Sequence, residues 1–94
     1  MKRIYKYQLE TIDEQFIEVP LLLGNMFEKQ VLKVDTQHGI PCIWIMVDDE
    51  QQKIRRKILI RGTGHECSGG IDPDTYLGSY QLYDGAFVGH VFGF

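Results

Sequence analysis

The sequence lacks both a long apolar run and a secretion signal. The apolar run from Ile43 to Val47 has five residues, whereas a membrane-spanning helix needs about 18 or more. The residues that follow Met1 alternate between charged, apolar and polar types and do not form the apolar segment of a signal peptide. With 94 residues in total, we expect one soluble domain over residues 1–94, located in the cytoplasm.

The sequence also lacks a basic excess and a metal-binding pattern. Ten lysine and arginine residues stand against thirteen aspartate and glutamate residues, which gives a net charge of −3. This balance argues against bulk nucleic-acid binding. The two cysteines, Cys42 and Cys67, are far apart, and no Cys or His pair has the spacing of a zinc site. We therefore expect free thiols, no metal and no cofactor.

Signals for helices are nearly absent. Only residues 11–18 have some helical character, and Pro20 follows too closely for a long helix, so a strand or a single turn is expected there. Elsewhere apolar and polar residues alternate with the period of two that is typical of strands. This pattern predicts an all-β fold, a small antiparallel sandwich or partly open barrel of six to seven strands with hairpin connections. The expected strands are residues 2–10, 15–19, 31–37, 40–47, 54–61, 76–83 and 86–94.

Three connections set the expected strand register. Asp84-Gly85 and His38-Gly39 both predict two-residue hairpin turns, since such turns need positive φ at both central residues. The first turn places Ser79 opposite His90 and Tyr80 opposite Gly89. The polar residues 48–53 predict a third hairpin, which would pair residues 47 and 54.

These turns predict a three-stranded sheet with one apolar core face. The second turn pairs Leu32 with Ile45, and the core face would carry Leu32, Val34, Ile43, Ile45, Val47, Ile54, Ile58 and Ile60. Such a face needs a covering layer, and a chain of this length has few strands left to supply one. We therefore expect a homo-oligomer, which would also cover open strand edges.

The opposite face and the adjoining loop predict a site for an anionic ligand. Glycines let successive backbone N–H groups point into one concavity. The predicted ligand residues are Arg61, Gly62, Thr63, Gly64 and His65, with Trp44 or Tyr76 stacking on a base. In this register Trp44 would lie between Lys33 and Lys57, beside Arg55 and Arg61. Two alternatives stay open: the glycines serve only turns, and Trp44 is covered by lysine stems or by the last hairpin.

A catalytic site is not expected. Cys67 with His65 or His90 as base would give a small hydrolase-like enzyme, which is an alternative function. Such a nucleophile needs a fixed Cys–His contact and a third, orienting group. A glycine-rich loop is a poor platform for that geometry.

Five short stretches resemble a family of small, functionally uncharacterised proteins of bacteriophages and prophages. The resemblance covers nearly the whole chain, although Gly89 stands where family members often have tryptophan. It implies an intracellular phage accessory protein without known catalytic residues. By analogy, such a protein binds a host protein or a small nucleotide-like anion, for example to counteract a host defence, or is a minor structural protein of the virion. The matching stretches are residues 4–7, 39–44, 61–65, 76–81 and 87–92.

Overall fold

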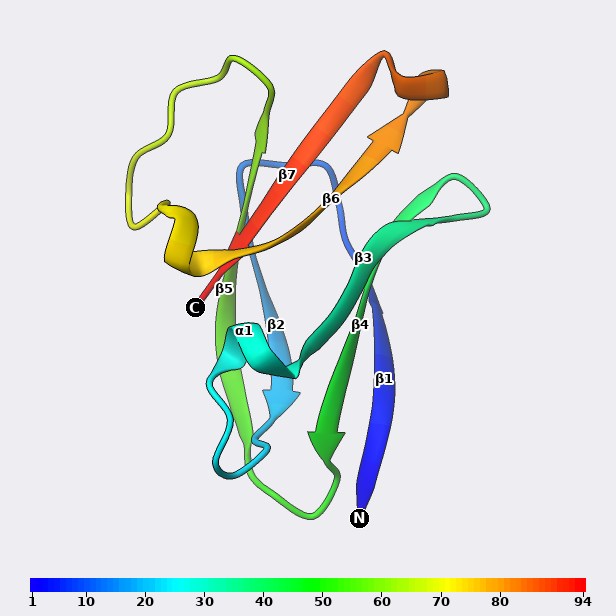
Figure 1. The fold of residues 1–94 in the computed structure, drawn as a ribbon. Coiled ribbons are helices and arrows are strands. Elements are labelled where there is room, and N and C mark those ends of the chain that lie inside the picture. The colour runs from blue at the N-terminus through cyan, green and yellow to red at the C-terminus, as the bar shows by residue number, and fades with distance from the viewer.

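The structure, a computed structural model, describes residues 1–94 and consists mainly of seven strands (Figure 1). The strands are β1 (Lys2–Gln8), β2 (Glu14–Pro20), β3 (Val31–Gln37), β4 (Ile40–Asp48), β5 (Lys53–Gly62), β6 (Tyr76–Leu82) and β7 (Phe87–Gly93). One α-helical turn, α1 (Phe27–Gln30), precedes β3. Short 3-10 turns, η1 (Pro73–Thr75) and η2 (Tyr83–Gly85), flank β6.

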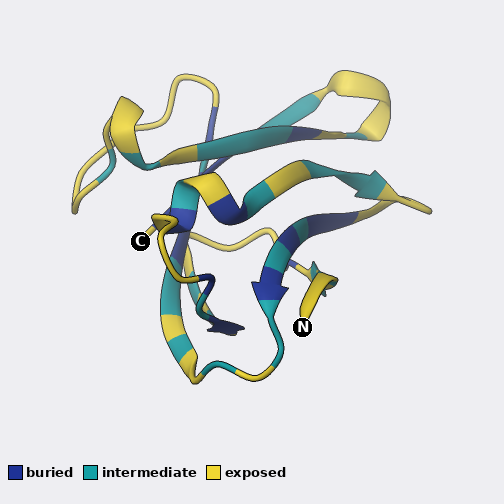
Figure 2. Cartoon of the chain, turned by 60° about the horizontal axis from the view of Figure 1, so that its bottom comes forward, coloured by how far each residue is buried: buried dark blue, intermediate teal, exposed yellow.

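The strands form two antiparallel sheets, which confirms the predicted all-β sandwich. One sheet has three strands in the order β1-β4-β3, and the other has four in the order β2-β5-β7-β6. They pack against each other without closing into a barrel (Figures 1 and 2).

The core lies between the two sheets and comes from alternating residues of the central strands. Ile43, Ile45 and Val47 of β4 face Ile58 and Ile60 of β5, and none of the five is more than 3% exposed. Figure 2 shows that exposed residues concentrate in the turns and loops. One chain thus supplies both layers of the core. The open strand edges are then the only remaining argument for the expected homo-oligomer, which stays a prediction.

The hairpin at His38-Gly39 forms as predicted, apart from one bulge. The two residues have φ of 54° and 77°, and Gln37 pairs with Ile40. The register then shifts, so that Val31 rather than Leu32 pairs with Ile45. The prediction that Leu32 belongs to the core is therefore wrong. The extra residue at the bulge leaves Leu32 unpaired and 50% exposed.

The hairpin of β6 and β7 has the predicted register and the predicted turn. Ser79 pairs with His90, and Tyr80 pairs with Gly89. Asp84 and Gly85 have φ of 54° and 89°, and the Ala86 N–H donates to the Tyr83 carbonyl at 3.0 Å, which closes the two-residue turn. Regular strand pairing ends one pair earlier than predicted, at Leu82 and Phe87, and Tyr83 also has a positive φ, of 55°.

The predicted pairing of β4 with β5 is wrong. β4 lies between β1 and β3, whereas β5 lies between β2 and β7, so residues 49–52 connect the two sheets. The segment after β2 bonds to the start of this connection, since the Asp48 N–H donates to the Leu21 carbonyl at 3.2 Å. Two strands with one apolar face each can bury those faces as opposed layers or within one layer, and the sequence pattern does not distinguish the two arrangements.

The α1 turn was not predicted, and it connects the sheets. The buried Gln30 amide donates to the Pro20 carbonyl of β2 at 3.1 Å and to the Met46 carbonyl of β4 at 3.0 Å. No helix in the structure has the length and apolar character needed to span a membrane.

Candidate functional site

The Arg61 side chain, expected to bind an anion, is held by the backbone of its own chain. Its Nη1 donates to the Asp13 carbonyl and to the Ile60 carbonyl, each at 2.9 Å. Asp13 lies in the connection between β1 and β2. The Arg61 guanidinium therefore fastens that connection to the end of β5.

Residues 62–65 form a tight turn whose polar groups bond to one another. The His65 N–H donates to the Gly62 carbonyl at 3.0 Å, and the Gly62 N–H donates to His65 Nδ1 at 3.3 Å. The His65 ring packs directly on Gly62, because a Cβ placed there would lie 2.8 Å from His65 Cε1. These contacts agree with the alternative that the glycines of this segment serve a turn.

Four polar side chains of three segments form a hydrogen-bonded chain on the outer face of the four-stranded sheet. Thr63 Oγ1 lies 2.7 Å from His90 Nε2, and His90 Nδ1 lies 3.1 Å from Ser79 Oγ. Ser79 Oγ in turn lies 2.7 Å from the Tyr76 hydroxyl. No carboxylate bonds to His90, so this chain lacks the acidic member of a Ser-His-Asp triad.

The sequence predicts only part of this series of hydrogen-bonded side chains. Two of the predicted ligand residues, Thr63 and Tyr76, lie at its ends. The Ser79–His90 pair follows from the predicted hairpin register. Thr63 reaches His90 because β5 pairs with β7 and places Arg61 beside His90. No local signal predicts that pairing.

An apolar pocket of about 430 Å³ lies next to this chain. The rings of Tyr76 and Phe92 meet edge to face, with centroids 5.6 Å apart. Cys67 is exposed and its Sγ lies 3.8 Å from the His65 carbonyl, with no hydrogen bond to either imidazole. The Cys–His contact that a hydrolase-like mechanism needs is therefore not formed. The pocket is lined by Cys67, Ile71, Asp72, Pro73, Tyr76 and Phe92.

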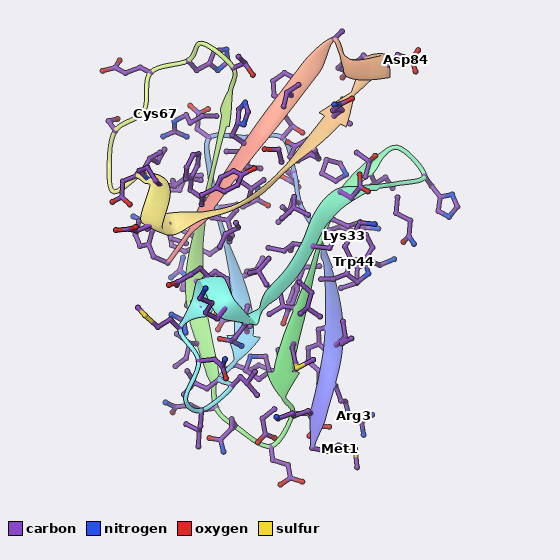
Figure 3. All side chains as sticks on the ribbon, viewed as in Figure 1. Met1, Arg3, Lys33, Trp44, Cys67 and Asp84 are labelled. Carbon is purple, nitrogen blue, oxygen red and sulfur yellow. The ribbon has the colours of Figure 1, made fainter.

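Trp44 lies in the other sheet, away from the other predicted ligand residues. The prediction that it is flanked by Lys57, Arg55 and Arg61 is wrong, because β4 and β5 do not pair. Its neighbours are Lys6 of β1 and Lys33 of β3, and Lys33 Nζ is 5.8 Å from the ring centroid. Figure 3 shows Lys33 and Trp44 beside each other on the three-stranded sheet, far from Cys67.

The cations of β5 surround a different aromatic ring. Phe16 of β2 is 44% exposed, with the Arg55 guanidinium 3.9 Å and Lys57 Nζ 5.9 Å from its ring centroid. Lys57 also pairs with Glu14 at 3.2 Å. Glu14 therefore neutralises part of the positive charge that Arg55 and Lys57 place around Phe16.

The outer face of the three-stranded sheet is apolar at its centre and basic at its sides. Ile4 pairs with Met46 and Lys6 pairs with Trp44 across β1 and β4. Ile4 is 57% exposed, and Trp44 and Met46 are half-buried. We call Ile4, Trp44 and Met46, with the flanking Lys2, Lys6 and Lys33, the Trp44 face. The last hairpin belongs to the other sheet, so the alternative that it covers Trp44 is excluded.

A family model described as a domain of unknown function matches residues 1–93. The chain belongs to the DUF7352 family. No curated protein and no solved structure matches it significantly. The resemblance to a family without a known function is thereby confirmed at the level of the family.

The site residues of this DUF7352 protein divide between two surfaces. Arg61 and residues 62–65 lie at one end of the four-stranded sheet, where Arg61 Nη1, the Gly62 N–H and the Thr63 hydroxyl bond within the chain. Trp44 lies on the three-stranded sheet. It is half-buried, and the Lys33 ammonium lies 5.8 Å from its ring centroid.

Proposed function

We propose that this protein is a non-enzymatic accessory binding protein of a bacteriophage or prophage. It acts in the cytoplasm of the bacterial host cell by binding a host protein, for example one that belongs to a host defence. The observation that supports this proposal is the Trp44 face, an apolar sheet surface on which Ile4 is 57% exposed and Trp44 and Met46 are half-buried. Exposed apolar patches rimmed by polar residues typically mark protein interaction sites.

The charges of the Trp44 face favour an acidic partner. Lys2, Lys6 and Lys33 outnumber the carboxylates of Asp35 and Asp48 on the same strands. A partner segment with acidic residues around an apolar side chain would match both the centre and the sides of the face. A second copy would instead bring like-charged lysines together. A small nucleotide-like anion is less well supported, because Arg61 Nη1, the Gly62 N–H and the Thr63 hydroxyl already have partners within the chain.

The test replaces Trp44 and compares it with an aromatic residue on the other sheet. Tryptophan is enriched among residues that dominate binding energy, each worth about 2 kcal/mol or more. Once a host protein captured by the wild type has been identified and purified, we expect Trp44→Ala to weaken its binding by roughly 30-fold in calorimetry. Phe16→Ala, which removes the exposed aromatic ring of the four-stranded sheet, should leave the affinity unchanged.

Two results would contradict this assignment. Equal losses of affinity in both variants would mean that binding does not depend on the Trp44 face. Sedimentation at micromolar concentration provides the second result, because a wild-type dimer that dissociates in Trp44→Ala would make a second copy the occupant of the face. A dimer that persists in Trp44→Ala would support the predicted homo-oligomer through a strand edge.

A further inference from the structure

The edge of β1 is open, whereas the other three sheet edges are engaged within the chain. β3 and β6 lie against each other, since a Cβ on Gly78 would lie 2.8 Å from Val34 Cβ. The edge of β2 receives the Tyr7 hydroxyl, which donates to the Glu18 carbonyl at 2.8 Å. β1 pairs only with β4 and lies at the margin of the three-stranded sheet (Figure 1).

The backbone groups at this edge belong to alternate residues of β1. The Leu9 N–H donates to the Pro41 carbonyl at 2.9 Å, and the Asp49 N–H donates to the Met1 carbonyl at 3.0 Å. The odd-numbered residues between them therefore form the pairs that bond to β4. The even-numbered residues direct their N–H and carbonyl groups to the open edge, where these groups have no hydrogen-bond partner in the chain. They are Lys2, Ile4, Lys6 and Gln8.

The side chains of the same residues lie on the Trp44 face. Residues that are directly opposite each other in adjacent strands have their side chains on the same side of the sheet. Ile4 is opposite Met46, and Lys6 is opposite Trp44. A further strand beside β1 would likewise place alternate side chains on the Trp44 face, next to those of β1. The open edge and the Trp44 face are therefore continuous.

The charges of β1 favour an acidic strand at this edge. The strand contains Lys2, Arg3 and Lys6 and no carboxylate. Arg3 pairs with Asp49, but Lys6 bonds only to the neutral Gln37 side chain, at 2.7 Å, and Lys2 has no ion pair. A second copy of β1 would add three more cations, and lysines on edge strands are a common means of keeping identical edges apart.

We propose that an extended acidic segment of the partner protein adds to this sheet as a fourth strand, antiparallel to β1. Its acidic residues lie opposite Lys2 and Lys6, and an apolar residue lies opposite Ile4. Strand addition takes affinity from backbone hydrogen bonds and specificity from alternate side chains. This inference rests on the function proposed for the Trp44 face, because it states how the partner of that face is held.

The test is a titration of the ¹⁵N-labelled protein with a peptide, followed through amide NMR shifts. The probe is an acetylated and amidated heptapeptide in which threonine alternates with glutamate, valine and glutamate. We expect saturable shifts at residues 2–8 and 44–46. A peptide with lysine in place of glutamate should bind at least about tenfold more weakly, because two attractive charge contacts become repulsive.

Two N-methylated peptides distinguish strand addition from binding through side chains alone. In the proposed pairing the N–H groups of the glutamates and the valine face β1, and those of the threonines face solvent. Methylation of the glutamate and valine nitrogens should weaken binding at least about tenfold, because it removes the donors to β1. Methylation of three threonine nitrogens should leave binding unchanged. Equal binding of the two peptides would overturn strand addition and leave the function proposed for the Trp44 face intact.

Variants locate the binding charges. Replacing both lysines, Lys2→Gln with Lys6→Gln, should weaken binding of the probe about tenfold. Lys29→Gln, at an exposed lysine of α1, should have no effect, and the amide spectrum of each variant reports whether it is folded. The inference is also overturned by an absence of saturable shifts, by shifts centred away from β1, or by a wild-type dimer that the probe dissociates, since a second copy would then occupy the edge. The capture of a host protein and its loss in Trp44→Ala test the proposed function separately.

Discussion

At the scale of single residues, Gly78 determines how closely the two sheets approach. Its φ is 151°, which side chains rarely adopt, and a Cβ there would lie 2.8 Å from Val34 Cβ and 2.9 Å from Val34 Cγ2. We expect Gly78→Ala to lower the free energy of unfolding by about 2–4 kcal/mol, through strain and overpacking together. Urea denaturation measures this loss.

Gly24 provides the matched control for Gly78. It also has a positive φ, 86°, but a Cβ there meets no atom within 4 Å. Gly24→Ala should therefore cost only the backbone term, about 1–2 kcal/mol. Equal losses of unfolding free energy at the two positions would show that the contact with Val34 does not limit how closely β3 and β6 approach.

Gly89 has a similar role beneath the buried Tyr80. A Cβ on Gly89 would lie 2.5 Å from Tyr80 Cζ, and Tyr80 is 2% exposed. A tryptophan at this position cannot coexist with the Tyr80 ring in its present place. The glycine and the tyrosine are therefore a coupled pair in this chain.

At the scale of elements, the α1 turn stabilises the sandwich through Gln30. Its side-chain amide serves carbonyls of β2 and β4 at once. We expect Gln30→Ala to cost about 1–3 kcal/mol, because two carbonyls lose their donor in a buried place. Lys29→Ala, at an exposed position of the same turn, should change stability by less than about 0.5 kcal/mol. Thermal or urea unfolding distinguishes the two, and equal effects would contradict a role for the amide.

Elements defined by local signals could be predicted from the sequence, and non-local pairings could not. The hairpin at His38-Gly39 follows from its turn residues and from alternation on both sides. The pairings of β1 with β4 and of β5 with β7 have no such local signal, so β5 was assigned to the wrong sheet. The four-residue α1 turn was missed because its N-cap, Met26, makes no side-chain capping bond.

The candidate site shows the same limit. Lys33 was correctly placed beside Trp44, because one hairpin relates the two residues. Lys57 was wrongly placed on the other side, where the structure has Lys6 of β1. A flanking lysine was expected on each side of Trp44, but its identity depended on a pairing between distant segments.

At the scale of the whole molecule, stability should fall at alkaline pH. The Tyr80 hydroxyl lies 2.8 Å from Thr11 Oγ1, which ties the β1–β2 connection to β6. Burial raises the pKa of Tyr80 above its usual value of 10.0, and the pKa of Tyr7 is raised in the same way. The folded state then holds these protons more tightly than the unfolded state does. The stabilisation is complete below pH 10 and is lost as the pH rises through the folded-state pKa.

A variant of Tyr80 tests this pH dependence. Tyr80→Phe should cost about 0.5–1.5 kcal/mol at pH 8, where the hydroxyl bond is lost. It should also show a smaller further loss between pH 8 and pH 11 than the wild type does. Tyr83→Phe, at a tyrosine that is 79% exposed, should follow the wild-type curve. Urea titrations at both pH values give the comparison, and parallel curves for all three proteins would contradict the assignment.

The strand order also governs how the chain reaches its native state. Only β3–β4 and β6–β7 are hairpins of neighbouring strands, whereas Gln8 must find Cys42 and Pro20 must find Lys53, about 33 residues further along the chain in each case. Hairpins form within about 1–10 μs, but closing long loops costs chain entropy before any contact compensates for it. We therefore expect the two hairpins to assemble first and the N-terminal strands to be recruited last onto β4 and β5. We expect folding as a whole in the millisecond-to-second range that is typical of small β domains.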